Sequence, residues 1–406
     1  MVRFGRNGLL AAAAGAALVA CGARIYLSAD CCKPSTVLAQ EKKPLGGDLI
    51  PLRQVVDPYA VFNGIAVDPD NNLLVMTDVN RKSLVAYDRT EPLNKRDGMT
   101  PTQHQVFGPE TNIGFVAGVV LDPARREIYA VNNDIEDTMV VMPYGVEGNA
   151  EPKRLLSVPH QAWGLALGRS AGEIAVTVEL HQAIVFYRQD AHGIEKPLRF
   201  IRGADTGLAD PHGVYWDESR HEIGAANHGN FRGLVKDVGA GCVPTGTADP
   251  EGGAVKPPSI TIYTADAQGN QKPLRTITGE HTSLDFPMGM AVDEGHGEIA
   301  VANNGDNSLL IFDRTASGDV APKRVISGDK TGISRPMGVA IDAKDGEIWV
   351  SNFSDHSAVA FDWAANGNVA PKRVIRTAPP GTPSPGFGNP QTVAYDSKRE
   401  QILVPN

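Results

Sequence analysis

Two histidines in the middle of the chain have the residue type and spacing of metal ligands. His212 directly precedes a Gly-Val-Tyr-Trp-Asp segment, and His228 follows Asn227 at the end of the next apolar segment. If these segments are neighbouring antiparallel strands, both imidazoles could reach one divalent cation. Such a site would suit a metal-dependent lyase or lactonase with its site at the mouth of the fold.

Glu179 and His181 precede this pair in the chain and are further candidates. The Glu179 carboxylate could act as the base that a metal-assisted reaction needs. Other catalytic motifs fail on spacing, because His221-Glu222 is followed by Ala225 where a helical zinc protease needs its second histidine. The sequence contains no Gly-x-Ser-x-Gly turn. The catalytic residues are therefore unknown, with His212, His228 and Glu179 as candidates.

The histidines belong to a sequence repeat that starts near residue 63. Two clear copies are Pro336–Asp342 followed by Glu347–Asn352, and Pro287–Asp293 followed by Glu298–Asn303. Each copy continues with an alternating segment and then with Pro-Lys-Arg-Val-Ile, which gives four short strands per unit. The repeat therefore predicts an all-β chain built from four-stranded units.

The starts of the first strands set the number of units. They lie at Gly64, Gly118, Gly164, Gly213, Gly289, Gly338 and, less regularly, Thr392. Seven starts predict a β-propeller of seven four-stranded blades over residues 35–406. The last unit has only two strands, and residues 35–56 match the two that it lacks. We therefore expect a split closing blade from residues 35–56 and 390–406, with a propeller of six blades as the alternative.

Polar residues recur at the ends of the strands. Aspartate ends the first strand in six of the seven units, and asparagine ends the second strand at positions that include Asn132, Asn227, Asn303 and Asn352. Turns that begin with a side chain accepting backbone N–H groups explain the aspartates without any ligand, and the asparagines are expected to cap turns in a similar way. We therefore interpret both rows as structural.

The segments Gly64–Asp68, Asn72–Asp78 and Leu84–Asp88 resemble the NHL repeat of bacterial β-propeller proteins. The resemblance covers residues from about 35 to 406 and implies the architecture more than the activity. NHL-like propellers serve as platforms for protein or RNA. The wider group of six-bladed propellers includes lyases and lactonases.

The residues directly before the repeated glycines predict the lining of the channel mouth. Besides His212, this row contains Trp163, Met288 and Met337 and carries little charge. These side chains could form an apolar floor for a ligand, whereas a hard cation would find few carboxylates. With Asn227 and His228 added, they are the predicted ligand-binding residues. The sequence thus favours a binding or scaffold module, which needs no cofactor and binds a protein, peptide or glycan. Only the enzymatic alternative requires a divalent metal ion.

The fourth unit differs most from the others. Its second and third strands are separated by a Gly-rich insertion between Asn230 and Pro258 that contains Cys242. Because second strands end on the face where first strands begin, we expect this insertion to overhang the ligand face.

Residues 1–21 have the features of an export signal. Arg3 and Arg6 precede an apolar run, and Leu18-Val-Ala-Cys21 resembles a bacterial lipobox, in which the cysteine is acylated. Cleavage after Ala39 and an uncleaved anchor are the alternatives. We expect a linker at 22–34, an extracytoplasmic location in the periplasm, outer envelope or medium, and membrane attachment only through lipid on Cys21.

Composition excludes two further classes of function. The formal net charge is −9 at pH 7, and no cluster of lysine or arginine offers a binding surface to nucleic acid. The four cysteines lack Cys-x-x-Cys spacing, so a redox dithiol and a c-type haem lack their ligands.

Overall fold

The computed structural model describes residues 48–49, 62–79, 81–88, 102–229, 256–342, 345–354, 357–375 and 393–404. The chain divides into two units, Met1–Thr36 and Val37–Asn406, and every described residue belongs to the second. The predicted signal with Cys21, the linker at 22–34 and residues 230–255 of the insertion lie outside the described residues. No helix in the described ranges is long and apolar enough to cross a membrane.

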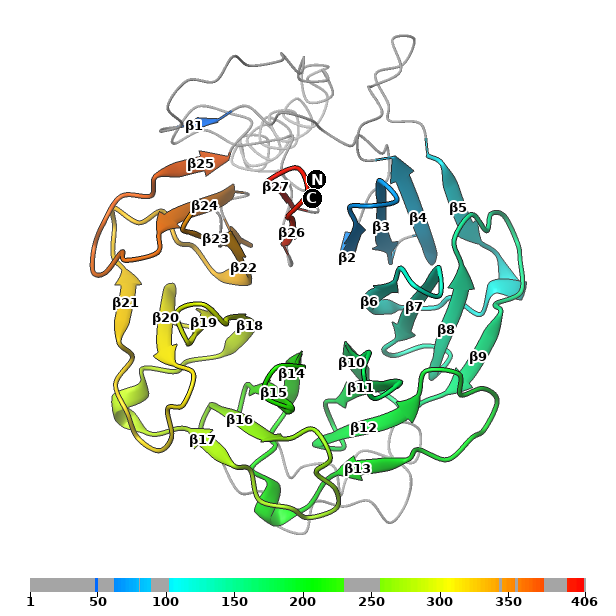
Figure 1. Ribbon diagram of the computed structural model, residues 1–406, viewed down its shortest axis with the longest axis horizontal. Coiled ribbons are helices and arrows are strands. Elements are labelled where there is room, and N and C mark those ends of the chain that lie inside the picture. The colour runs from blue at the N-terminus through cyan, green and yellow to red at the C-terminus, as the bar shows by residue number, and fades with distance from the viewer. Residues whose placement is uncertain are drawn as a thin grey trace, which may run out of the picture. The chain divides into compact units, whose positions relative to one another are not determined.

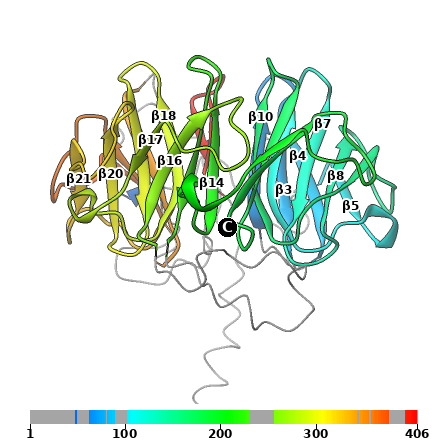
Figure 2. The same ribbon diagram turned by 90° about the horizontal axis from the view of Figure 1, so that it is seen from below.

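Six antiparallel four-stranded blades follow one another around an axis, each with its first strand innermost (Figure 1). The sheet of the sixth blade contains a fifth strand, β1 (Asp48–Leu49), which is parallel to its neighbour. Seen from the side, the sheets stand upright around that axis (Figure 2). The first and second blades consist of β2 (Phe62–Asp68), β3 (Leu73–Asp78), β4 (Ser83–Asp88) and β5 (His104–Phe107), then β6 (Val116–Asp122), β7 (Glu127–Asn132), β8 (Thr138–Pro143) and β9 (Arg154–Ser157). The third and fourth consist of β10 (Ala162–Gly168), β11 (Glu173–Val178), β12 (Ala183–Arg188) and β13 (Arg199–Ile201), then β14 (Pro211–Asp217), β15 (Glu222–Asn227), β16 (Ser259–Thr264) and β17 (Arg275–Ile277). The fifth and sixth consist of β18 (Pro287–Asp293), β19 (Glu298–Asn303), β20 (Ser308–Asp313) and β21 (Arg324–Ser327), then β22 (Pro336–Asp342), β23 (Glu347–Asn352), β24 (Ser357–Asp362) and β25 (Arg373–Ile375).

The remaining described elements are short. They are β1 (Asp48–Leu49), β26 (Ala394–Asp396), β27 (Gln401–Leu403) and the 3₁₀ helices η2 (Pro109–Thr111), η3 (Ala204–Thr206) and η5 (Glu280–Thr282). The three helices follow β5, β13 and β17, and each leads from an outer strand toward the next inner strand. The six predicted inner strands that start at the repeated glycines are therefore confirmed.

The repeated glycines allow the blades to converge at the axis. A Cβ atom added at Gly64, Gly118, Gly164, Gly213 or Gly289 would lie between 2.5 and 2.8 Å from a backbone carbonyl oxygen of the next inner strand. Real Cβ atoms essentially never approach so closely, and a carbonyl of a paired strand cannot move aside cheaply. Glycine is therefore the residue that these positions require.

The aspartate and asparagine rows are structural, as predicted. Asp68 Oδ1 accepts the backbone N–H groups of Asp70 and Asn71, each at 3.1 Å, and aspartates in other blades do the same. In the second row, Asn132, Asn227, Asn303 and Asn352 each accept a backbone N–H from 18 residues earlier in the chain. These bonds fix the turns on both sides of the inner strands.

A buried ion pair joins the second and fourth strands of five blades and was not predicted. In the second blade, both carboxylate oxygens of Glu127 accept hydrogen bonds from Arg154, at 2.8 and 2.7 Å. The equivalent pairs are Glu173–Arg199, Glu222–Arg275, Glu298–Arg324 and Glu347–Arg373. The first blade has Leu73 and His104 at the two positions, so the acid and the arginine are absent together.

The hydrophobic core lies between successive sheets. Each cluster combines side chains of two neighbouring blades, as Tyr129 and Val131 of the second blade pack with Val176 and Val185 of the third. The same arrangement recurs between the other successive blades. Each sheet therefore buries both of its faces, which explains the nearly continuous apolar strands of the repeat.

The number of four-stranded blades is six, not the seven that the strand starts predicted, and it matches the stated alternative. The difference arises at the chain ends. The unit that starts at Thr392 contributes the two-stranded sheet β26–β27. Within residues 35–56 the structure describes only β1, which pairs in parallel with β25 of the sixth blade. The pairing resembles the parallel bridge between Ile326 and Gly367 at the preceding blade boundary. The other residues expected to complete the closing blade lie outside the described residues, so the split closing blade stays a prediction.

The sheet β26–β27 packs between the sixth and first blades. Tyr395 and Ile402 pack against the cluster around Trp349 of the sixth blade, and Leu403 packs against that of the first blade. The Tyr395 hydroxyl donates to Asp342 Oδ1 at 2.7 Å, and Arg399 donates to the carbonyl oxygen of Pro69 at 3.0 Å. The C-terminal residues thus take part in closing the ring.

Replacing Tyr395 by phenylalanine is expected to lower the free energy of unfolding by about 1.5 kcal/mol, because a hydrogen bond to a carboxylate is lost. The matched variant is Tyr144→Phe, which removes a hydroxyl that donates to Asp68 Oδ2 at 3.1 Å across the first blade boundary. Urea denaturation measures both. A loss for Tyr144→Phe with none for Tyr395→Phe would show that β26–β27 does not stabilise the folded ring.

Candidate functional site

Side chains from four inner strands line one cavity. Trp163 from β10, His212 from β14, Met288 from β18 and Met337 from β22 line a cavity of about 230 Å³, together with Val393 beside β26. These are the residues directly before the repeated glycines. The structure therefore brings together the predicted apolar floor.

An irregularity in the inner strands explains why these side chains share one direction. The pairing register shifts between Ala162 and Leu165, and the same shift occurs between Pro211 and Val214 and between Pro287 and Met290. A β-bulge redirects a side chain away from the regular alternation of a strand. The residue before each repeated glycine lies in such a bulge, which suits it to point into the cavity.

The residue directly after the second strand differs in type between the blades, and in the third and fourth blades it is a residue that could do chemistry. In the second blade, Asn133 Nδ2 donates to the carbonyl oxygen of Ala162 in the next blade, and Asn304 makes the same bond to Pro336 in the fifth, both at 3.2 Å. Glu179 and His228 occupy this position in the third and fourth blades. There the asparagine is replaced by residues that can take part in acid–base or metal chemistry.

Both replacements contact the cavity-lining residue of the next blade. Glu179 Oε1 lies 3.4 Å from Nε2 of His212, and His228 Nε2 lies 2.8 Å from the sulfur of Met288. The strand hydroxyl of Thr177 donates to the carbonyl oxygen of His212 at 2.9 Å and holds its backbone in place. The candidate site therefore spans three consecutive blades.

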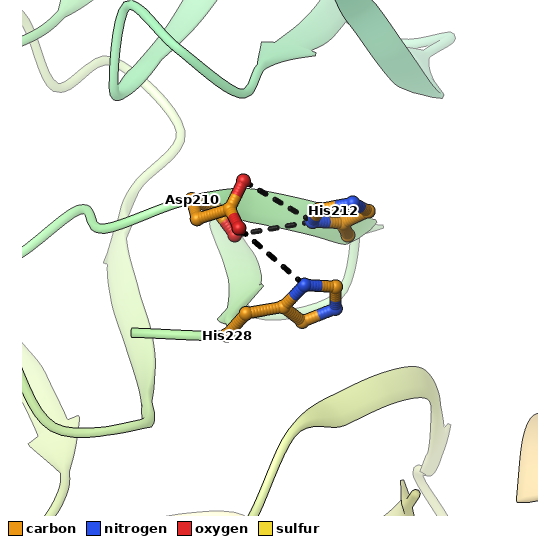
Figure 3. A group of neighbouring side chains, drawn as sticks. All are labelled: Asp210, His212 and His228. Carbon is orange, nitrogen blue, oxygen red and sulfur yellow. Dashed lines mark hydrogen bonds and ion pairs between the residues drawn. The ribbon is translucent and has the colours of Figure 1, made fainter. Parts of the chain in front are cut away.

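Asp210 completes a group of three with His212 and His228 (Figure 3). Its carboxylate oxygens lie 3.8 Å from Nδ1 of His212 and 3.6 Å from Nδ1 of His228. Asp210 adopts a left-handed backbone conformation with φ of 56°, and its carbonyl oxygen accepts the backbone N–H of His228 at 3.2 Å. Aspartate tolerates this conformation better than most residues. The backbone that shapes the turn thus also places the carboxylate beside the Nδ1 atoms of both rings (Figure 3).

The two imidazoles are part of an aromatic stack. Their centroids lie 3.7 Å apart at an interplanar angle of 20°, and the ring of Phe286 stacks on the other face of His228 at 3.9 Å. Trp163 meets His212 at 5.0 Å with the rings tilted by 58°. Both histidines are buried, with exposed fractions of 9% for His212 and 4% for His228.

Burial controls the charge of His212. Loss of hydration and the neighbouring His228 lower the pKa of His212 to about 4, and the attraction of Asp210 does not compensate. At neutral pH His212 is therefore uncharged. A carbonyl oxygen only accepts, so Nδ1 of His212, 3.1 Å from the carbonyl oxygen of Asp210, carries the proton in this arrangement.

Three predicted residues lie outside the cavity and the group of three, and of these Glu179 contacts the group through His212. Asn227 is fully buried in its blade, where its amide accepts from Ala209 and donates to Thr261. The charged neighbours of His181 are Arg202, His160 and Asp137, and burial lowers the pKa of His181. Asp210 was not predicted, although its place two residues before His212 in Asp-Pro-His was a readable signal.

Comparisons with known proteins support the fold. No protein-family model matches the chain, and no curated protein matches it. The crystal structure of the mitotic checkpoint complex matches with a TM-score of 0.60 and 12% identity over 92% of this chain and 96% of that one. The WD40 β-propeller domain of Doa1 matches with a TM-score of 0.56 and 13% identity, over 84% and 88% of the two chains. Hydrazine synthase of Kuenenia stuttgartiensis matches with a TM-score of 0.60 and 12% identity, over 88% and 98%.

These likenesses show a β-propeller. At such identities they show the fold alone, and the NHL-repeat identity and the ligand stay predictions.

Proposed function

We propose that the protein is a binding module that takes an apolar side chain of a protein or peptide partner into the cavity at the mouth of the propeller. The observation that carries this proposal is the cavity of about 230 Å³ lined by Trp163, His212, Met288 and Met337. Concave sites lined by apolar side chains with a few polar groups are typical of ligand binding. The β-propeller fold in general suits a binding or scaffold role.

The lining of the cavity favours a peptide over a glycan. Methionine side chains adapt their shape to different apolar partners, and full burial of one large apolar side chain contributes about 1.5–3 kcal/mol. A sugar could stack on Trp163, but Met288 and Met337 offer no strong hydrogen-bonding atoms to its hydroxyl groups. Contacts outside the cavity would have to supply the rest of the affinity.

Selection from a displayed peptide library tests the proposal. Peptides with an apolar anchor residue are expected to be enriched on the wild-type protein, and Met337→Glu is expected to weaken their binding at least about tenfold, because it places a charge in the cavity. The control is Phe107→Glu, which changes an apolar residue that is 51% exposed on β5, away from the cavity. Equal binding of the enriched peptides to wild type and Met337→Glu would reject the cavity as their site.

The extracytoplasmic location and the acylation of Cys21 stay predictions of the sequence, because residues 1–21 lie outside the described residues. The metal-dependent lyase or lactonase is the second candidate. It is favoured by one observation, the group formed by Asp210, His212 and His228. Its first requirement is a bound cation.

A further inference from the structure

We propose that Asp210, His212 and His228 form a binding site for one divalent transition-metal ion of the zinc type, at the edge of the mouth cavity. The site goes beyond the binding module, because it does not depend on whether the cavity takes a peptide. Two imidazoles and one carboxylate are a donor set that suits zinc and its neighbours better than calcium or magnesium.

The ligand atoms are almost as far apart as a metal ion would hold them. One carboxylate oxygen of Asp210 lies 3.8 Å from Nδ1 of His212, and the other lies 3.6 Å from Nδ1 of His228. All three groups have ligand atoms within 4.8 Å of one another. In a tetrahedral site with bonds of about 2.0–2.1 Å, ligand atoms are separated by about 3.4 Å. The two distances to Asp210 exceed this value by only a few tenths of an ångström, and the orientation of the rings is the larger change that binding requires.

Each imidazole has an acceptor behind it, on the side away from the proposed ion. Nε2 of His228 lies 2.8 Å from the sulfur of Met288, and Nε2 of His212 lies 3.4 Å from Oε1 of Glu179. Metal-binding histidines commonly donate their second N–H to such a group, which leaves the other nitrogen deprotonated for the metal. In this arrangement both Nδ1 atoms would face Asp210 with free electron pairs. Glu179 thus acts as a positioning residue for His212.

His228 has an acceptor for the tautomer that a metal ion requires. Donation from its Nε2 to Met288 would leave Nδ1 of the neutral ring as an acceptor that faces the carboxylate of Asp210, 3.6 Å away. Two electron-rich groups that face each other inside a protein repel unless a cation or a proton lies between them. A metal ion at this point removes the repulsion.

His212 must turn when the ion binds. A metal ion lies in the plane of each imidazole that coordinates it, and two rings stacked at 3.7 Å with planes 20° apart cannot both point at one ion. Phe286 and Met288 hold His228, whereas His212 borders the cavity, so His212 is the ring that we expect to turn. Rotation gives up the hydrogen bond from Nδ1 to the carbonyl oxygen of Asp210, and the ring then carries its proton on Nε2, the nitrogen that lies 3.4 Å from Oε1 of Glu179 before the ring turns.

Three protein ligands leave the fourth position of a tetrahedral ion open. Structural zinc sites use four protein ligands, whereas sites that bind water or substrate keep a free position. Because His212 lines the cavity, the open position would face a group bound there.

Metal titration of chelator-treated protein tests the site. Zn²⁺ binding is measured by calorimetry, and Co²⁺ is used as a spectroscopic probe of the ligand geometry. The wild type is expected to bind one ion per chain. Asp210→Asn and His228→Gln are expected to weaken metal binding at least about 100-fold. Loss of a residue that only hydrogen-bonds to a metal ligand already weakens binding about 10- to 100-fold, and loss of the ligand itself should weaken it more. Asparagine keeps the left-handed backbone at position 210.

The control variant is His281→Gln, which removes a histidine from an exposed pair with Asp319 and is expected to leave metal binding unchanged. Circular dichroism verifies the fold of each variant. Should His228→Gln fail to fold, the metal affinity of Asp210→Asn alone tests the site. The site is refuted if the wild type binds no stoichiometric ion, or if Asp210→Asn binds as tightly as the wild type. Asp210 does not line the cavity, so peptide binding by Asp210→Asn separates failure of the metal site from failure of the peptide site.

Discussion

Replacing Gly289 by alanine is expected to lower the free energy of unfolding by about 3 kcal/mol, measured by urea denaturation. The added Cβ would lie 2.5 Å from the carbonyl oxygen of Met337 in the next inner strand and 3.0 Å from Cα of Gly338. Both atoms are backbone atoms of a paired strand, so relief requires the fifth and sixth blades to move apart. Such a movement would also disturb Met288 and Met337 at the cavity.

The matched control is Gly295→Ala in the exposed turn that follows the same strand. The nearest atom to its new Cβ is Oδ1 of Asp293 at 3.2 Å, which belongs to a side chain rather than to the backbone. We expect a change within about 0.5 kcal/mol. Equal destabilisation by the two variants would contradict close contact between blades as the cause, because the effect of a Gly→Ala change on the unfolded chain is by itself stabilising.

The sequence predicts the blades well because the same residue types recur at the same positions of each blade. A glycine at the convergence point and an aspartate that begins a turn recur in every full unit except the third, where Gly168 replaces the aspartate, and they mark the inner strands. The number of blades was predicted wrongly because every strand start was counted as a full blade, and the seventh start leads to two described strands, β26 and β27. The split closing blade stays a prediction, because most of residues 35–56 lies outside the described residues.

The candidate site was predicted only in part, for a physical reason. Position in the repeat identifies which residues reach the mouth, and so Trp163, His212, Met288 and Met337 were found together. Asp210 lies outside the repeated strand, and its role depends on a left-handed backbone and on the stacking of two rings. Periodicity contains no information on such side-chain geometry.

Replacing Glu127 by glutamine is expected to lower the free energy of unfolding by about 3 kcal/mol at neutral pH. The Glu127 side chain is 2% exposed and accepts hydrogen bonds from Arg154, Lys153 and Tyr129. Glutamine removes the negative charge and leaves Arg154, which is 15% exposed, without its counter-ion. Removal of one partner from a buried pair costs more than the pair contributes, because the other charge stays buried.

The loss should depend on pH in a defined direction. Hydrogen bonds from Arg154 are the largest cause that lowers the pKa of Glu127 from 4.5 to about 2. A carboxylate whose pKa is lower in the folded state stabilises the fold above its unfolded pKa. Its contribution disappears as the pH falls through the folded pKa. The difference between wild type and Glu127→Gln should therefore be full above pH 5 and shrink from about pH 4.5 toward pH 2.

Glu147→Gln is the control, because this carboxylate is 73% exposed and its contact with His104 is screened by water. It should change the free energy of unfolding by less than about 0.5 kcal/mol at any pH. A penalty for Glu127→Gln that stays constant between pH 7 and pH 3 would contradict the ion-pair explanation and point to packing instead. Against the effect of burial, hydrogen bonds from Arg275 and Arg324 also lower the pKa values of Glu222 and Glu298, so we expect the same direction of pH dependence at these two pairs.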